Sequence, residues 1–137
     1  MKRQKPPQRV NKPRFAVDIN TSFVTLIKNY GKFATFTSTA KLTKKQDTGD
    51  DEIVKISDSE NYHIITHNTR HFENAPLKFQ NLKIGIICVN LKEANYINSF
   101  GKLLREFKKH DNYKTKLIYI GNETRIKSYS EVRKKSL

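Results

Sequence analysis

Short apolar segments rich in β-branched residues alternate along this chain with segments of helical periodicity. The most hydrophobic segment, 83–89, predicts a central strand buried on both faces of a sheet. Strands are predicted at 14–20, 33–37, 62–65, 83–89 and 115–120. Because parallel strands need long crossover connections, which helices supply, the alternation predicts a three-layer α/β/α fold with a mostly parallel central sheet.

Helices are predicted where apolar residues recur at i, i+3, i+4 spacing and a capping residue precedes them. These helices cover 23–30, 50–57 and 90–109, with caps at Thr21 or Ser22, at Asp47 or Thr48, and at Asn90. Segments 38–49 and 67–81 are predicted as loops, the second broken by Pro76. After a turn at 121–124, segment 125–129 is expected to return as an antiparallel edge strand.

The length of 137 residues suits one domain, and basic ends flank it. We expect a basic arm at 1–13, the domain at 14–129 and a basic tail at 130–137. The formal net charge is +14, and residues 1–14 alone carry six cations and no acid. Such basic ends attract polyanions, so RNA is the expected partner, although a purely solubilising role is the alternative.

Cysteine content and hydropathy exclude several other classes of protein. A single cysteine, Cys88, cannot form a disulfide or a cysteine-based zinc site within one chain, and its apolar neighbours predict that it is buried. No apolar run approaches the roughly 20 residues needed to span a bilayer. The first residues are basic and rich in proline, without the apolar stretch of a secretory signal. The cytoplasm is therefore the expected location, with no membrane partner.

Three polar positions fall at strand ends or helix starts that a parallel sheet brings to one edge. Asp18 follows the first strand, Asp50 and Asp51 open a helix, and Asn68 follows the strand at 62–65. Carboxylate and amide oxygens are the ligands that Mg²⁺ prefers, and a bound Mg²⁺ or Mn²⁺ can activate water against a phosphate. The alternative for Asp50 and Asp51 is structural, since acids in a first turn complement the helix dipole.

These segments resemble a known family. Asp18 after an apolar strand, Asp50-Asp51-Glu52-Ile53 at a helix start, and Thr66-His67-Asn68-Thr69-Arg70-His71-Phe72 after a strand resemble a PIN-like domain. The last segment is similar to the Thr-x-Asn/Asp-x-x-x-Phe signature of VapC-type toxin ribonucleases. The C-terminal segments 116–120 and 124–127 look more like the compact PIN-like branch related to Mut7-C.

The resemblance implies a Mg²⁺- or Mn²⁺-dependent endoribonuclease. Such enzymes are often the toxin of a toxin–antitoxin pair, so an acidic antitoxin is one candidate partner, and a second copy of the chain in a homodimer is another. By position, Asp18, Asp50 and Asn68 would be catalytic, with Asp51 a fourth candidate for the metal. Asn68 stands where many relatives have aspartate, and residues 31–46 contain no acid to match a further one usual in these toxins. These departures support an alternative, a non-catalytic RNA-binding module with a degenerate site.

Basic, hydroxyl and imidazole side chains near these segments are the candidate contacts to RNA. They are Arg14, Thr66, His67, Arg70, His71, Lys102 and Arg105. Thr66 has two compatible alternatives, orienting a metal-bound water or capping the turn that follows the strand. His63, inside a strand, is predicted to be structural, and His110, after a helix, is predicted to be solvated. Phe72 is predicted to lie in the core.

Overall fold

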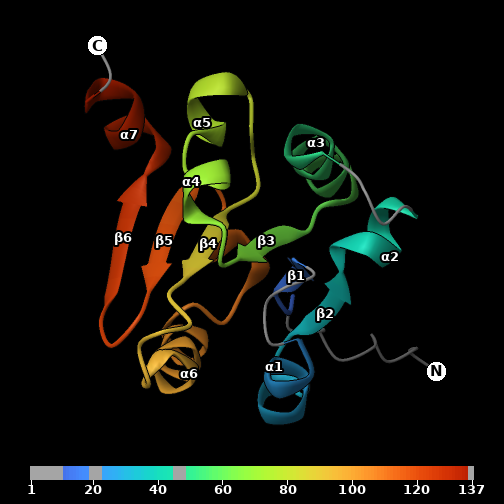
Figure 1. Ribbon diagram of the computed structural model, residues 1–137, viewed down its shortest axis with the longest axis vertical. Coiled ribbons are helices and arrows are strands. Elements are labelled where there is room, and N and C mark those ends of the chain that lie inside the picture. The colour runs from blue at the N-terminus through green and yellow to red at the C-terminus, as the bar shows by residue number, and fades with distance from the viewer. Residues whose placement is uncertain (1–10, 19–22, 45–48, 136–137) are drawn as a thin grey trace, which may run out of the picture.

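The structure, a computed structural model, describes residues 11–18, 23–44 and 49–135 and is built on one six-stranded sheet (Figure 1). The strand order is β2-β1-β3-β4-β5-β6, with β1 to β5 parallel and β6 antiparallel to β5. The strands are β1 (Arg14–Val17), β2 (Thr35–Ser38), β3 (His63–Thr66), β4 (Ile86–Val89), β5 (Lys116–Ile120) and β6 (Thr124–Ser128). The predicted fold class, the central place of β4 and the antiparallel edge strand are confirmed.

Paired isoleucines explain why β3 and β4 lie in the middle of the sheet. Successive residues of a strand face opposite sides, so Ile65 and Ile87 enter one core while Ile64 and Ile86 enter the other. All four are fully buried. Burying each such side chain contributes about 1.5–3 kcal/mol, which an edge strand covered on one face could not gain from two successive residues.

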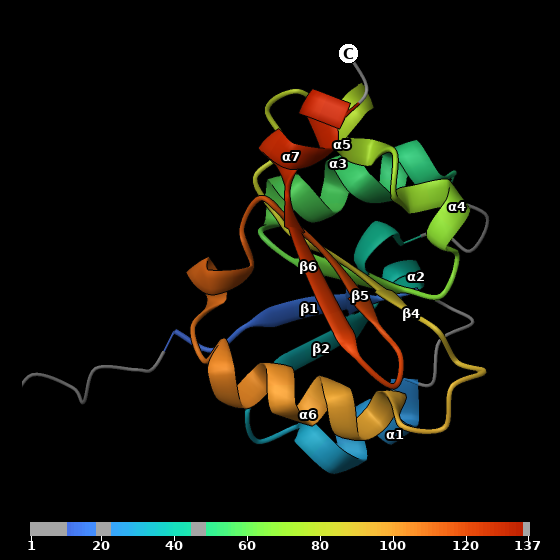
Figure 2. The same cartoon turned by 90° about the vertical axis from the view of Figure 1, so that its left-hand side faces the viewer.

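Helices cover both faces of the sheet (Figures 1 and 2). On one face lie α1 (Phe23–Tyr30) and α6 (Tyr96–Glu106), whose Phe100 packs edge-on against Phe15 of β1, with ring centroids 5.6 Å apart. The other face carries α3 (Asp50–Glu60), α4 (Thr69–Phe72), α5 (Ala75–Lys78) and α7 (Tyr129–Lys135). The short helix α2 (Thr39–Thr43) follows β2, and a 3₁₀ turn, η1 (His110–Tyr113), precedes β5.

Two successive crossovers have opposite hands. The connections β3–β4 and β4–β5 step in the same direction across the sheet. Phe72 and Ala75 of the first connection belong to one core, whereas Phe100 and Leu104 of the second belong to the other. Since crossovers between parallel strands are right-handed in nearly all proteins, one of these two departs from that rule.

The predicted loops at 38–49 and 67–81 contain helices, which is a correction to the sequence analysis. Helices α2, α4 and α5 have only four or five residues each, too few to show a 3.6-residue period. Pro76 lies in the first turn of α5, where its missing N–H costs nothing, so it does not break that helix. Phe72 is fully buried, as predicted, and ties α4 to the core.

The starts of two helices also differ from prediction. The N-cap of α3 is Gly49, which makes no side-chain cap hydrogen bond; the predicted caps at 47–48, and those at 21–22, lie outside the described residues. Helix α6 begins at Tyr96, not near Asn90. Asn90 instead starts a turn, and the Glu93 carboxylate accepts hydrogen bonds from Asn90 Nδ2 (3.1 Å) and from the backbone of Asn122 (2.7 Å).

Parts of both predicted basic ends make contacts with the rest of the fold. The segment 130–135 is part of α7, and Arg133 of that helix donates to the carbonyl oxygens of Pro76, Phe79 and Gln80. At the other end, Pro13 is buried and the Asn11 carbonyl accepts a hydrogen bond from the backbone of His110 (2.7 Å). The rest of the predicted arm, residues 1–10, lies outside the described residues.

Two histidines close the amino end of β1 and β3. The rings of His63 and His110 stack with centroids 3.9 Å apart, and their residues are 0% and 1% exposed. His63 Nδ1 accepts the Gly85 N–H (2.8 Å) and His110 Nδ1 accepts the Arg14 N–H (3.0 Å), which fixes both rings as neutral tautomers protonated on Nε2. Prediction of a structural His63 is therefore confirmed, and that of a solvated His110 is wrong.

Candidate functional site

The candidate site lies where β1 and β3 end. The order β2-β1-β3-β4-β5 is that of a doubly wound sheet in which the chain leaves β1 toward β2 and later returns past it to β3. Ligands of such sheets bind beyond the carboxyl ends of the strands at this switch point. Asp18 follows β1 there, and its N–H donates to the Ile65 carbonyl (2.8 Å), which extends the pairing of β1 with β3 by one residue.

The Asp18 carboxylate is held by two side chains from the end of β3. Thr66 Oγ1 and Asn68 Nδ2 both donate to Asp18 Oδ2, at 2.8 and 3.1 Å. The Thr66 hydroxyl also accepts the Asn68 N–H (3.0 Å), so it caps the turn, one of the two roles predicted for it. Asp18 is 5% exposed and Thr66 0% exposed. The carboxylate is therefore oriented by the fold, and Thr66 reaches Asp18 rather than any molecule outside the protein.

Asp50 and Asp51 have partners of their own. His71 Nδ1 lies 2.7 Å from Asp50 Oδ2, and Lys78 Nζ donates to Asp51 Oδ1 (3.2 Å). These side chains line a separate hollow, together with Arg70. Within residues 11–18, 23–44 and 49–135, no group of three or more histidine, cysteine, aspartate or glutamate side chains is placed to hold a metal ion. Asp18 and Asn68 thus meet as predicted, whereas Asp50 and Asp51, the other predicted metal ligands, contact His71 and Lys78.

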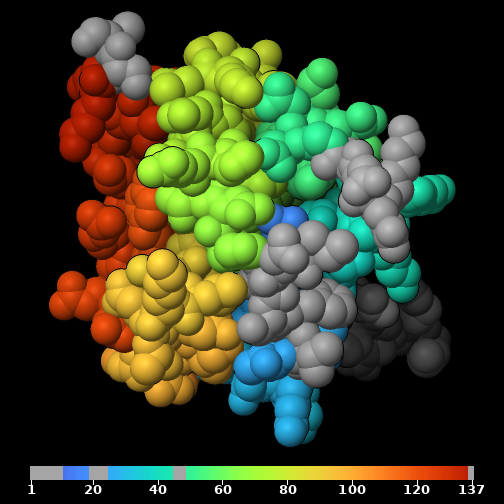
Figure 3. All heavy atoms as spheres, in the orientation of Figure 1, coloured from blue at the N-terminus to red at the C-terminus, as the bar shows by residue number. Residues whose placement is uncertain are grey.

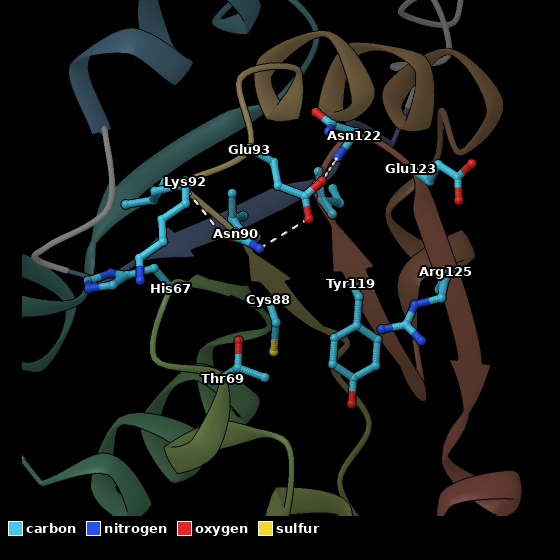
Figure 4. Close-up of a pocket in the computed structure, with 14 residues that line it drawn as sticks. His67, Thr69, Cys88, Asn90, Lys92, Glu93, Tyr119, Asn122, Glu123 and Arg125 are labelled. Atoms are coloured by element: carbon cyan, nitrogen blue, oxygen red, sulfur yellow. Dashed lines mark hydrogen bonds between the residues drawn. The ribbon is translucent and has the colours of Figure 1, made fainter.

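A recess of about 780 Å³ opens beside this edge, between the loop after β4 and the turn from β5 to β6. Figure 4 shows His67 and Lys92 on one side of it and Tyr119 with Arg125 on the other. In the space-filling view, the loop after β4 (gold) meets α4 (light green) at the surface (Figure 3). Of the predicted residues, His67 lines this recess.

The other polar side chains of the recess were not predicted from the sequence. Tyr119 and Arg125 are directly opposed in the β5–β6 pairing, and the Arg125 guanidinium lies 5.1 Å from the centre of the Tyr119 ring. Tyr119 also donates its hydroxyl to Glu73 Oε2 (2.9 Å). Burial, followed by the Glu73 contact, raises the pKa of Tyr119, so it stays a neutral phenol. That Tyr119 lies opposite Arg125 became clear only from the register in which β5 pairs with β6.

Cys88 borders the recess without being a nucleophile. It is 2% exposed, and burial raises the pKa of its thiol to about 12. Since the thiolate is the reactive form of cysteine, this residue packs as a small apolar side chain, as predicted.

The other predicted RNA contacts are spread over the molecule. Arg14 lies at the amino end of β1, the opposite end from Asp18, with its guanidinium 4.1 Å from the centre of the Tyr62 ring. Lys102 and Arg105 are exposed on α6, outside the sheet edge. Arg70 and His71 are exposed on α4 beside Asp50. The predicted residues therefore form no single surface, and only His67, Asn68, Arg70 and His71 lie in the loop and helix that follow β3.

Comparisons with known proteins leave the family open. No family model, curated protein or solved structure matches this chain. Nor does any helix in the described ranges have the length and apolar character needed to cross a membrane.

Proposed function

We propose that this protein is a divalent-metal-dependent endoribonuclease of the PIN-like class, with its reaction centre at Asp18. The observation that carries the proposal is the Asp18 carboxylate, nearly buried, oriented by Thr66 and Asn68, and placed at the switch point of the sheet. A buried acid costs free energy to keep, so a carboxylate held at the switch point of a sheet is a candidate functional group. The formal net charge of +14 supports RNA as the substrate.

The residues at this edge could hold one metal ion through few protein ligands, rather than through three carboxylates. Mg²⁺ is commonly held by one or two carboxylates, with water and substrate phosphate completing its shell. Asp18 offers a carboxylate and Asn68 an amide oxygen, whereas Asp50 would first have to leave His71. A bound Mg²⁺ or Mn²⁺ would activate water and offset charge on the phosphate. The protein's own part is to keep the Asp18 oxygen fixed, which Thr66 does from a fully buried position.

A non-catalytic RNA-binding module is the second candidate. The observation that favours it is that Asp50 and Asp51 are each paired with a basic side chain, His71 and Lys78. Both candidates keep RNA as the ligand. They differ in whether Asp18 is needed for a reaction.

If the protein is an RNA-cleaving toxin, its inhibitor is an acidic protein. Charge complementarity with a chain of +14 supports this partner, since association of opposite charges is fast and selective. Isolation of the protein from its native host should then yield a small acidic companion, and a chain that is always recovered alone would argue against the toxin role.

Asp18→Asn is the direct test, with Asp111→Asn as its matched control. Both variants lose one carboxylate, but Asp111 is exposed in η1, at the amino ends of the strands and opposite the end where Asp18 lies. Cleavage of a labelled RNA with Mn²⁺ should fall by at least about 100-fold in Asp18→Asn and stay unchanged in Asp111→Asn, because several kcal/mol of transition-state stabilisation depend on the metal. The rise in melting temperature given by Mn²⁺ should also shrink in Asp18→Asn alone.

Two results would overturn the proposal. Asp18→Asn protein that cuts RNA at the wild-type rate would remove Asp18 from the reaction. Wild-type protein that binds RNA, but neither cuts it nor gains stability from Mn²⁺, would leave the binding module as the function.

A further inference from the structure

A second candidate surface lies between α1 and α6, on the face of the sheet remote from α3 and α4 (Figure 2). It is a groove of about 500 Å³, which we call the α1–α6 groove. Its apolar lining includes Tyr30, Phe33 and Leu104. Four cations, and no acid, complete the lining; they are Lys12, Lys32, Arg105 and Lys108. All four of these cations are exposed.

The floor of the groove is fixed by contacts between the two helices. Tyr30 donates its hydroxyl to the Ile97 carbonyl of α6 (2.7 Å), and its ring packs edge-on against Phe100 with centroids 5.7 Å apart. Gly101 permits this approach, because a Cβ at that position would collide with the Tyr30 hydroxyl. The groove is therefore a feature of the folded chain, since its floor is bonded to both helices.

Phe33 lines the groove and is largely exposed. The turn after α1 is fixed by a hydrogen bond from the Phe33 N–H to the Tyr30 carbonyl (2.9 Å). Phe33 is 61% exposed, the most of the three large hydrophobic residues that are exposed in the described part of the chain. A single exposed phenylalanine is ordinary. An exposed ring surrounded by four cations, with no acid among the lining residues, is the combination that single-stranded nucleic acids need for stacking and phosphate contacts.

We propose that the α1–α6 groove binds single-stranded RNA, with a base stacked on Phe33 and phosphates held by Lys32, Arg105 and their two basic neighbours. The groove is a binding site separate from Asp18, which lies at the strand ends. The proposal rests on RNA being a ligand, and it holds whether or not Asp18 supports cleavage. Binding in this groove would hold one part of an RNA while another part reaches Asp18 at the edge of the sheet.

Charge decides among the possible occupants. A second copy of the chain would bring another +14, and residues 1–14 carry six cations and no acid, so neither complements this groove. RNA and an acidic apolar protein segment both satisfy the cations. RNA is favoured because Phe33 offers a largely exposed aromatic side chain among four cations, and every base can stack on an aromatic ring.

The test separates an aromatic requirement from an apolar one. Binding of a labelled twelve-nucleotide single-stranded RNA is measured by fluorescence anisotropy, in EDTA and in the Asp18→Asn background, so that cleavage cannot contribute. Phe33→Leu should bind about tenfold more weakly with an unchanged salt slope, and Phe33→Tyr should bind as the parent does. Lys32→Gln and Arg105→Gln should each lower the slope of log affinity against log salt by about 0.7. Lys55→Gln, an exposed change on α3, is the control and should alter neither.

Three results would overturn the site. The first is that Phe33→Leu binds the RNA as tightly as the parent does, and the second is that neither Lys32→Gln nor Arg105→Gln changes the salt slope. The third is that a synthetic peptide of alternating glutamate and leucine displaces the RNA equally well from Phe33→Tyr and Phe33→Leu. The first two would remove RNA from the groove, and the third would assign it to an acidic protein segment. Protein that binds RNA through Phe33 but never cuts it would support this site and refute the proposed ribonuclease.

Discussion

Strands β1 and β3 are tied together by a buried polar cluster at each end, and the two clusters differ in kind. At the amino end, the ring nitrogens of His63 and His110 are each bonded to one partner, and both rings are neutral. At the carboxyl end, an acid, Asp18, receives two donors and is nearly buried. A neutral, fully bonded cluster can only stabilise the fold, whereas an oriented carboxylate retains capacity for chemistry.

The amino-end cluster should have the largest effect on stability. His63→Leu leaves the Gly85 N–H and the His110 carbonyl buried without partners. At 1–3 kcal/mol for each orphaned group, we expect the free energy of unfolding to fall by roughly 3 kcal/mol. Urea denaturation measures this change. A loss below about 1 kcal/mol would mean that water replaces the imidazole, and that the histidine cluster contributes little to holding β1 and β3 together.

Acid should weaken the amino-end cluster next. Burial, reinforced by His110, lowers the pKa of His63 from 6.5 to about 3, and burial also lowers that of His110. Below pH 6.5 the two histidines therefore bind protons in the unfolded chain but stay neutral in the folded chain. Their contribution to the free energy of unfolding, which is present above pH 6.5, is lost as the pH falls toward 3. His63 alone should remove about 2 kcal/mol between pH 7 and pH 5. Denaturation of the wild type and His63→Leu at both pH values checks this, because the variant should lose less.

The carboxyl-end cluster should respond to a smaller change. Thr66→Val keeps the shape but removes the hydroxyl that donates to Asp18 and accepts from the Asn68 backbone. We expect a loss of about 1.5 kcal/mol, together with weaker Mn²⁺ stabilisation if Asp18 binds metal. Thr66→Ser keeps the hydroxyl and is the matched control. A loss in Thr66→Ser with none in Thr66→Val would show that the methyl group, and not the hydrogen bonds, is what Thr66 contributes.

Asp50 should matter least to stability. Its carboxylate and His71 are both substantially exposed, at 36% and 62% of their side-chain areas, and exposed pairs contribute little. Asp50→Asn should therefore change the free energy of unfolding by less than about 0.5 kcal/mol. The Mn²⁺-induced shift in melting temperature is the sharper readout. A reduced shift would show that Asp50 leaves His71 to reach a metal at Asp18, and an unchanged shift would confine the metal to Asp18 and Asn68.

Local patterns determined the sheet and part of the site. The consecutive isoleucines of β3 and β4 required burial on both faces, and alternation with helices required parallel pairing, so the central sheet followed from the sequence. Asp18 and Asn68 were placed at one edge because parallel strands end together, and their side chains do meet. The one-turn helices α4 and α5 were missed because a helix of four residues has no period to detect.

Contacts between residues distant in sequence were decided only by the tertiary structure. Whether Asp50 faces Asp18 or His71 depends on where α3 packs relative to α4, and no local pattern encodes that distance. His110 looked solvated because its neighbours are polar, yet it stacks on a residue 47 positions away. The α1–α6 groove likewise depends on the contact between Tyr30 and Gly101, which are 71 positions apart in the sequence. Sequence fixes what each segment can bury, and packing of the whole chain fixes which segments bury one another.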